Sequence, residues 1–320
     1  MIPGAPGFRV PSERAEPRRP EPAAPVRRSR TGSVDGLRPS GGGHTLLLRG
    51  DGMGRVENKI ALVTGAARGL GRSHAVRLAE EGADIIALDI CAPVAGIGYP
   101  MATPGDLRIT GDLVTEAGRR VVTAQVDVRE RQALAEAVQA GVAELGGLDT
   151  VVANAGVAAF GRWNDTDGQQ WEAVIGVNLT GTWNTMVATI PHLQARGGGS
   201  VVVIGSVASV EGLPCAEAYT ASQHGVFGLV RSLSAELIED RIRVNAVRPI
   251  GVSGTGMPQT LPAVADVQAD TRVGSAFHQG FAADTVEPAE VSNAVLYLAS
   301  DESRYVTGTA MPVNAGLISR

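Results

Sequence analysis

Cysteine, long apolar runs and basic charge are all scarce in this sequence of 320 residues. The two cysteines, Cys91 and Cys215, have no metal-ligand spacing, so no metal site is expected and a reducing, cytoplasmic setting is favoured. No apolar run reaches the ~18 residues that a membrane span requires. The net charge of -5 disfavours nucleic acid and anionic membranes as partners, because both bind basic surfaces. With 44% hydrophobic and 19% charged residues, the composition is that of an ordinary soluble α/β protein.

Residues 1–54 differ in composition from the rest of the chain. They hold eight of its 18 prolines and nine arginines, and their acidic residues argue against a transit peptide. Such a segment buries too little apolar surface to offset its ordering entropy, so we expect disorder. Alternatively, the segment is a mis-assigned extension and Met53 is the translational start. Residues 55–320 are expected to form one domain.

From residue 59 onward, strand, glycine turn and helix follow one another repeatedly. Apolar runs predict buried parallel strands at residues 60–63, 85–88, 121–126, 150–153, 201–204, 243–247 and 310–313. Periodic stretches predict helices at residues 72–81, 131–145, 171–193, 216–239 and 288–299. This alternation predicts an α/β fold, a single Rossmann-type, doubly wound parallel sheet of about seven strands with helices on both faces. Two segments interrupt it, an insertion at 90–106 and a segment at 250–287 that is either a mobile substrate lid or an ordinary surface loop.

A glycine-rich loop follows the first predicted strand. In the sequence TGAARGLG, residues 64–71, glycines leave room for backbone N–H groups and a helix N-terminus to approach a phosphate. The spacing is G-x-x-x-G-x-G, and the flanking strand and helix favour a dinucleotide site. The expected contacts in the loop are Gly65, Ala67, Arg68, Gly69, Leu70 and Gly71.

Asp89, at the end of the second predicted strand, decides which dinucleotide is expected. A carboxylate there accepts hydrogen bonds from the adenosine ribose and repels a 2′-phosphate, which indicates NAD over NADP. Arg68 leaves a smaller NADP alternative open, because an arginine in this loop can meet that phosphate. Asp127, after the third strand, is expected either to reach the adenine or to cap the next helix.

Polar residues at four further positions form a recognisable series. Asn154 follows the fourth strand, Asn178 lies within a predicted helix, Ser206 follows the fifth strand, and Tyr219 lies near a helix start. Taken alone, each has an ordinary structural interpretation as a cap, a core hydroxyl or a backbone-bonding amide. With the blocks TGAARGLG, NAG, VNLTG, YTASQHG and RVNAVRP, they make the chain resemble the short-chain dehydrogenase/reductase family over residues 57–316.

More narrowly, residues 54–91 and the block YPMATPGDL are similar to the carveol-dehydrogenase-like, mycofactocin-coupled branch of that family. The resemblance implies NAD-dependent hydride transfer to or from a hydrophobic secondary alcohol or ketone, terpenoid or alicyclic. It implies that the insertion helps to cover a tightly held NAD, that a mycofactocin-type acceptor takes the electrons, and that the chain forms a homotetramer. Small apolar residues near the expected substrate mouth agree with a hydrophobic substrate: Val157, Val207, Ala208, Leu213 and Ile250.

The resemblance also implies a role for each polar residue. Tyr219, as phenolate, takes the hydroxyl proton, Ser206 holds the substrate oxygen, and Asn178 fixes a water of the proton relay. The remaining implied cofactor contacts are Ile90, Val128, Asn154, Ala155, Gly156, Pro249, Gly251 and Val252, beside Tyr219 and Gln223.

Gln223 departs from the family motif Tyr-x-x-x-Lys. Four residues after Tyr219 on a helix, it shares a face with the tyrosine, so the spacing is kept and only the chemistry changes. Its amide can donate to a ribose hydroxyl, but it lacks the positive charge that stabilises a phenolate. Three interpretations stay open: a slow dehydrogenase with an alkaline optimum, a cofactor-binding or non-redox protein of the same fold, or an engineered or sequence-specific change that impairs a normal enzyme.

Overall fold

A computed structural model describes residues 54–257 and 285–316 and confirms the predicted parallel sheet. Its strands are β1 (Ile60–Thr64), β2 (Asp84–Asp89), β3 (Val121–Gln125), β4 (Thr150–Ala153), β5 (Gly199–Ile204), β6 (Ile242–Pro249) and β7 (Ala310–Val313). All of them pair in parallel, in the order β3-β2-β1-β4-β5-β6-β7. The expected N-terminal extension and most of the 250–287 segment lie outside the described residues.

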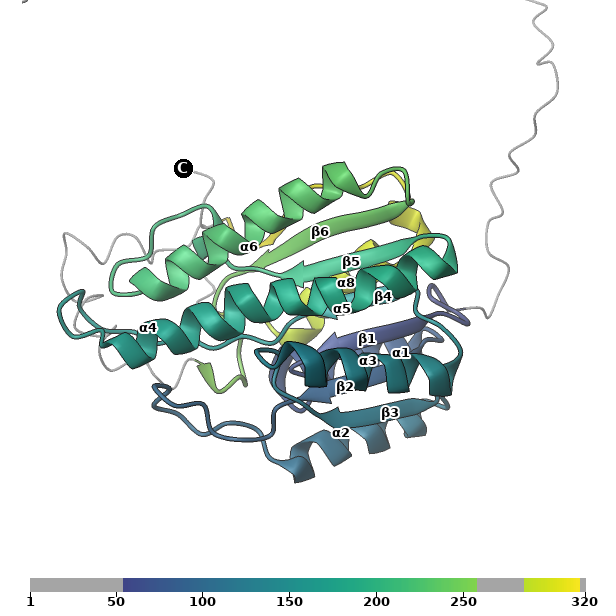
Figure 1. The fold of residues 1–320 in the computed structure, drawn as a ribbon, viewed down its shortest axis with the longest axis horizontal. Coiled ribbons are helices and arrows are strands. Elements are labelled where there is room, and N and C mark those ends of the chain that lie inside the picture. The colour runs from purple at the N-terminus through teal and green to yellow at the C-terminus, as the bar shows by residue number, and fades with distance from the viewer. Residues whose placement is uncertain (1–53, 258–284, 317–320) are drawn as a thin grey trace, which may run out of the picture. The chain divides into compact units, whose positions relative to one another are not determined.

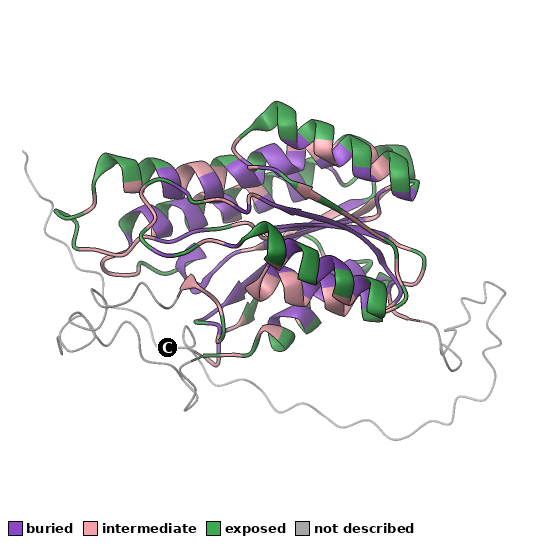
Figure 2. Ribbon diagram, turned by 90° about the horizontal axis from the view of Figure 1, so that it is seen from below, coloured by how far each residue is buried: buried purple, intermediate pink, exposed green. Residues whose placement is uncertain are grey.

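Helices cover both faces of this sheet, as predicted (Figure 1). One face carries α3 (Arg131–Leu145), α5 (Gly181–Arg196) and α6 (Glu217–Glu236), and the other carries α1 (Gly69–Glu80), α2 (Pro104–Glu116) and α8 (Pro288–Ala299). The strands and the inward helix faces are buried, whereas the outer helix faces are exposed (Figure 2). The fold is therefore the doubly wound α/β arrangement.

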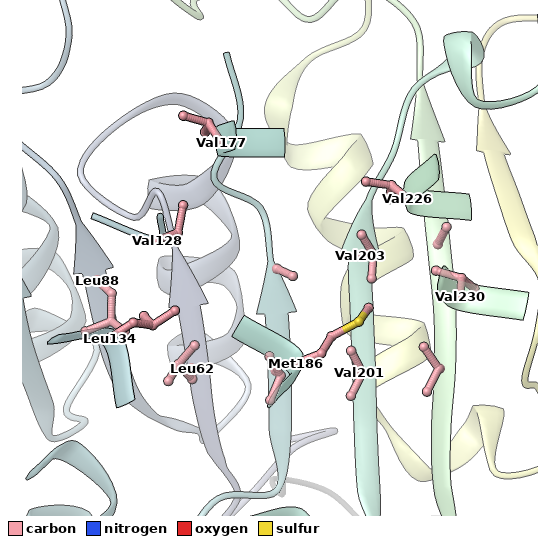
Figure 3. Close-up of a cluster of buried hydrophobic side chains, with 14 of the residues drawn as sticks. Leu62, Leu88, Val128, Leu134, Val177, Met186, Val201, Val203, Val226 and Val230 are labelled. Atoms are coloured by element: carbon pink, nitrogen blue, oxygen red, sulfur yellow. The ribbon is translucent and has the colours of Figure 1, made fainter. Parts of the chain in front are cut away.

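Alternate residues of β1 divide the hydrophobic core into two clusters. Leu62 belongs to the cluster beneath α3, α5 and α6, together with Leu134 and Met186 (Figure 3). Ala61 and Val63 belong to the cluster beneath α1 and α8. Because helices cover both faces of the sheet, the strand residues that point to either face are apolar. The strands therefore appear in the sequence as unbroken apolar runs.

The helix predicted at 171–193 differs from the structure, because a π-helical turn interrupts it. α4 (Gly168–Val174) leads into the π-helical residues Ile175–Thr180 and then into α5. The turn contains Asn178, whose side-chain amide is bonded to the backbone of Val157. A π turn is a local bulge at which a tertiary contact is made, and hydrophobic periodicity does not reveal it.

The insertion predicted at 90–106 runs into a helix, α2, that periodicity does not predict. Thr103 caps this helix: its Oγ1 accepts the N–H of Asp106 at 3.2 Å, and its own N–H donates to the Asp106 carboxylate at 2.8 Å. Pro104 occupies the first turn. A capping box followed by proline is a local signal of a helix start, so these residues could have located α2 in the sequence.

The chain reverses its direction of winding between β1 and β4. β1 is flanked by β2 on one side and by β4 on the other. Connections leave the carboxyl ends of β1 and β4 in opposite directions, which opens a crevice at that edge of the sheet. None of the helices described is long and apolar enough to cross a lipid bilayer.

Candidate active site

A cavity of about 700 Å³ lies at the carboxyl ends of the strands. Among the residues predicted for the site, it is lined by Gly65, Arg68, Gly69, Leu70, Gly71, Asp89, Ile90, Asp127, Val128, Asn154, Ala155, Gly156, Ser206, Tyr219, Gln223, Pro249, Gly251 and Val252. Ala67 and Asn178 lie outside this lining. The fold thus brings the predicted cofactor and catalytic residues together from the ends of β1, β2, β4, β5 and β6.

The loop that leads from β1 into α1 requires glycine at several positions, and Gly65 and Gly69 both have positive φ. Gly65 has a φ of +65°, a conformation that side chains with a Cβ rarely adopt. A Cβ on Gly71 would lie 1.9 Å from the carbonyl oxygen of Gly65, which no packing adjustment relieves. The amide of Asn154 donates to the carbonyl oxygen of Thr64 at 2.8 Å and so ties this loop to the end of β4. The result is a rigid backbone cradle of the kind that receives a pyrophosphate.

The carboxylate of Asp89 is held in place beside that cradle. One oxygen accepts the N–H of Ala67 at 3.0 Å, and the other accepts the N–H of Cys91 at 3.0 Å. The side chain is buried yet lines the cavity. Ala67 therefore acts on the site through Asp89, which presents a fixed negative charge at the position expected for the adenosine ribose.

Asp127 does not cap the helix that follows it, so one of its two expected roles is not realised. α3 starts after Glu130, which makes no side-chain capping bond. The Asp127 carboxylate instead accepts the backbone N–H of Arg129 at 2.9 Å and forms an ion pair with its guanidinium at 2.5 Å. In this arrangement Asp127 lines the cavity at the end of β3.

Arg68 connects the two sides of the cavity mouth. Its guanidinium donates to the carbonyl oxygen of Pro100, in the insertion, at 2.7 Å. A Cβ on Gly256 would lie 2.7 Å from the same guanidinium, so the segment after β6 packs directly against it. The side chain that left an NADP alternative open is therefore engaged with the insertion.

The insertion between β2 and α2 spans the cavity. Val94, Tyr99, Met101 and Ala102 line it, and none of these was singled out in the sequence. The hydroxyl of Tyr99 accepts the N–H of Ala158, beyond the end of β4, at 3.2 Å. Tyr99 is the one aromatic residue of the 90–106 segment, which is the signal that could have identified it.

Ser206 and Tyr219 meet at the opposite end of the cavity from Asp89. Ser206 lies close enough to Tyr219 to act on the pKa of its hydroxyl, and the Oγ of Ser206 accepts the N–H of Ala208 at 3.1 Å. Burial raises the pKa of Tyr219, and the hydrogen bond from Ser206 acts in the opposite direction. The ring of Phe160 lies 6.2 Å from that of Tyr219, between centroids. At neutral pH the tyrosine is therefore predominantly protonated.

Gln223 follows Tyr219 by one turn of α6 and is 5% exposed. Its side-chain oxygen has no hydrogen-bond partner among the residues of known placement, although it borders the cavity. The sole lysine of the sequence, Lys59, lies at the start of β1 and binds Asp301 at 2.5 Å. No ammonium group can therefore take the place of the motif lysine beside Tyr219.

Asn178 uses its whole amide for structure. Its oxygen accepts the N–H of Val157 at 2.8 Å, and its nitrogen donates to the Val157 carbonyl at 2.9 Å and to Ser222 at 3.1 Å. These bonds join the segment after β4 to α6, one residue before Gln223. Asn178 thus fixes the segment after β4 and helix α6, both of which line the cavity, without lining the cavity itself.

Apolar side chains form the rest of the catalytic end. Of the small apolar residues expected at the substrate mouth, Val157, Val207, Leu213 and Ile250 line the cavity, whereas Ala208 does not. Phe160 and Met257 extend the same apolar surface. This end can therefore hold a hydrophobic molecule against the hydroxyls of Ser206 and Tyr219.

Comparisons with known proteins agree with this geometry. A family model described as enoyl-(acyl carrier protein) reductase matches residues 65–318. The (-)-trans-carveol dehydrogenase of Rhodococcus erythropolis is 41% identical over 82% of this chain and 99% of its own.

Two solved structures are similar over their entire length. The carveol dehydrogenase of Mycobacterium avium in complex with NAD is 46% identical, with a TM-score of 0.79 over 84% of this chain and 100% of its own. A short-chain dehydrogenase of Mycobacterium paratuberculosis bound to NAD is 42% identical, with a TM-score of 0.80 over 83% of this chain and 100% of its own. The chain belongs to the short-chain dehydrogenase/reductase family.

Proposed function

We propose that this protein is an NAD-dependent oxidoreductase that acts on a hydrophobic secondary alcohol or ketone. One observation carries the proposal: Ser206 and Tyr219 lie in the same cavity as the glycine cradle and Asp89. The NAD complexes of two similar structures and the alcohol named for the carveol dehydrogenases support both the cofactor and the reaction.

The residues present fit NAD along the whole cleft. Gly71 lets the loop pack closely on the carbonyl of Gly65 and form the backbone cradle for the pyrophosphate, and Asp89 offers two backbone-anchored oxygens to the ribose. At the other end the unpartnered oxygen of Gln223 can accept a hydrogen bond from a hydroxyl of the second ribose, while its amide nitrogen can donate one. When bound, NAD supplies the nicotinamide that accepts or returns the hydride.

In the oxidation direction, the protein's own groups handle the proton. Tyr219 as phenolate takes the hydroxyl proton of the substrate, and Ser206 holds the substrate oxygen by a hydrogen bond. The side-chain amide of Asn178 is already hydrogen-bonded to Val157 and Ser222. A relay water in this region would therefore be bound by backbone groups and not by that amide. In the reduction direction, neutral Tyr219 returns the proton.

The substrate we propose is alicyclic or terpenoid, because the wall around Tyr219 is apolar and offers few polar contacts. Phe160 and Leu213 lie on this wall together with Val157. A ring with one hydroxyl or keto group places its single oxygen at Ser206 and its carbon skeleton on these side chains. The carveol named for the relatives has that chemistry.

The insertion acts as a strap over the cofactor. It is attached to the glycine loop through Arg68 and Pro100, and to the segment after β4 through Tyr99 and Ala158. Release of NAD would require these contacts to open. This supports a tightly held NAD that is reoxidised in place, with a mycofactocin-type carrier as the proposed electron acceptor.

We also propose a cytoplasmic homotetramer in which residues 55–320 form the NAD-binding domain and 250–287 the substrate loop. Trp171 on α4 and Trp183 on α5 expose large indole surfaces on the same continuous helical segment. Exposed aromatic groups of this size are typical of protein interfaces. Light scattering of the purified chain measures the state directly, and a monomer would contradict the tetramer.

Identification of any co-purified nucleotide, followed by turnover assays, tests the proposed function. The full chain is denatured, released nucleotide is analysed by mass spectrometry, and cyclic alcohols are then supplied with an artificial electron acceptor. NAD with turnover is the expected result. Bound NAD without turnover would favour a cofactor-binding protein that is inactive because Gln223 replaces the motif lysine. Failure to bind NAD would overturn the proposal.

A further inference from the structure

Tyr99 is a buried phenol for which the reaction described above has no use. It lies on the insertion between β2 and α2 and lines the cavity. Its hydroxyl accepts the N–H of Ala158 at 3.2 Å, which fixes it to the wall that Asn178 supports through Val157. The insertion therefore does more than cover the cofactor, because it carries a polar group into the substrate end of the cavity.

The proton of the Tyr99 hydroxyl has no acceptor among the residues that the structure describes. A phenol both accepts and donates a hydrogen bond, and here the accepting side is already used by Ala158. A hydrogen bond accepted from an N–H polarises the O–H and strengthens it as a donor. Burial raises the pKa of Tyr99 although the Ala158 N–H and the charge of Arg68 oppose the shift, so the group stays neutral near pH 7.

Tyr99 and Tyr219 face the same space. Both tyrosines line the cavity, and a negative charge on Tyr99 would raise the pKa of Tyr219. Among the described residues, the hydroxyl of Tyr99 is hydrogen-bonded to the N–H of Ala158 and not to Tyr219. Phe160 and Leu213, which also line this end, are apolar. A ketone oxygen within reach of both hydroxyls would accept a hydrogen bond from Tyr99 as well as from neutral Tyr219.

On the basis of the proposed function, we propose that Tyr99 is a further substrate-contacting residue, whose hydroxyl donates a hydrogen bond to the reacting oxygen of the alcohol or ketone. Proton transfer remains with Tyr219, and Tyr99 keeps its own proton throughout. An oxygen that acquires alkoxide character accepts stronger hydrogen bonds than a neutral one, so Tyr99 contributes most in the transition state. The neutral hydroxyl of Tyr99 thus stabilises negative charge on the reacting oxygen, at a site where Gln223 supplies no positive charge.

Tyr99→Phe in the full, NAD-loaded chain removes the hydroxyl and keeps the ring. We expect kcat/KM for a cyclic alcohol to fall roughly 10-fold, mostly through kcat, as for the loss of one hydrogen bond to a charged acceptor. The affinity for the cyclic ketone, measured by calorimetry, should fall by a smaller factor. Tyr305→Phe, at a tyrosine that is 89% exposed, is the matched control and should leave all three values unchanged.

A double-mutant cycle separates this role from a purely structural one. If Tyr99 and Ser206 hydrogen-bond the same oxygen, Tyr99→Phe combined with Ser206→Ala loses less activity than the product of the two single losses. Losses that simply multiply, or a Tyr99→Phe variant within twofold of the parent, would overturn the assignment. If the parent turns over no alcohol, the proposed function fails, and the role of Tyr99 is then judged by ketone affinity alone, where equal affinity in parent and variant overturns it.

Discussion

The two ends of the cavity are built differently. At the adenosine end, polar groups are fully engaged: the Asp89 carboxylate accepts two backbone N–H groups, and the Asn154 amide donates to carbonyls of the glycine loop. At the catalytic end, the Gln223 oxygen has no partner among the described residues, and neither does the hydroxyl proton of Tyr99. The polar groups of the adenosine end are therefore hydrogen-bonded without a ligand, whereas those of the catalytic end leave hydrogen-bonding capacity for one.

This difference separates binding from chemistry. Groups that are already hydrogen-bonded need no reorganisation when a cofactor arrives, which favours affinity. Groups that are buried and unpaired cost free energy until a ligand satisfies them, which favours recognition of a particular oxygen or ribose. Substitutions at the catalytic end should therefore mainly affect turnover, and substitutions at the adenosine end should mainly affect the affinity for the cofactor.

Tyr219→Phe should produce the largest effect, because it removes the proton acceptor and nothing else. We expect turnover of a cyclic alcohol to fall by ~10²–10⁴-fold. The affinity for NAD, measured by calorimetry on cofactor-free protein, should change by less than about twofold, since the glycine loop, Asp89 and Gln223 are left intact. A large loss of NAD affinity would show that the two ends are not separable.

Gln223→Lys should sharpen the contrast by giving the catalytic end its missing charge. Burial raises the pKa of Tyr219, and alcohol oxidation needs the phenolate, so the parent rate should rise with pH into the alkaline range. A nearby cation typically lowers such a pKa by ~1–3 units, which makes the phenolate roughly 10–1,000 times more abundant near pH 7. The variant should be faster at pH 7, with its pH profile shifted towards neutrality.

Gln223→Met is the matched control for that charge. It keeps the length of the side chain but has neither charge nor amide, so we expect no gain in rate and a weaker hold on the ribose. If Gln223→Lys changes neither the rate nor the pH profile, scarcity of phenolate does not limit this protein.

Asp89→Asn tests the adenosine end. Loss of the charge weakens hydrogen bonds to the ribose and removes the repulsion of a 2′-phosphate, so we expect the preference for NAD over NADP to shrink by roughly 10–100-fold. In the parent chain, NAD should raise the melting temperature more than NADP does at equal concentration. Equal shifts in the parent would remove the role assigned to Asp89.

The helix behind the glycine loop makes the scaffold sensitive to acid. His74 on α1 is buried against Ser292 on α8, and burial lowers its pKa from an ordinary 6.5 to about 3. The unfolded chain takes up a proton that the folded chain refuses, so stability falls as the pH drops from 6.5 towards 3, by at most ~1.4 kcal/mol per pH unit.

His74→Leu removes this proton uptake. In denaturant titrations between about pH 6 and pH 4.5, its stability should depend less on pH than that of the parent. His224→Gln, at an exposed position on α6, serves as the control and should keep the slope of the parent. A parent-like slope in His74→Leu would assign the acid sensitivity to other groups.

Much of the adenosine end could be predicted from local sequence. The glycines of the 64–71 loop and the position of Asp89 at a strand end follow from rules that involve a few neighbouring residues. The apolar runs predicted every strand for the same reason, since a strand buried on both faces leaves a continuous signal. The role of Asp127 could not be decided from the sequence. Its carboxylate binds Arg129, two residues later, and the sequence alone does not distinguish this contact from a bond to the N-terminus of the next helix.

The catalytic end shows what local patterns do not contain. Spacing on α6 placed Tyr219 and Gln223 on one face, but it said nothing of the buried, unpartnered amide oxygen. Tyr99 and the contact of Arg68 with Pro100 join segments more than 30 residues apart, and no periodicity relates such segments. The π turn around Asn178 likewise depends on a bond to Val157 from another element.

By itself, the sequence determined the layered sheet, the phosphate cradle and the loss of a cation beside the tyrosine, because these depend on residue identity and short spacing. Only the tertiary structure decided which polar groups are satisfied and which remain open to a ligand. Hydrogen-bond satisfaction depends on burial and on partners brought from distant segments, and these exist only once the chain has folded.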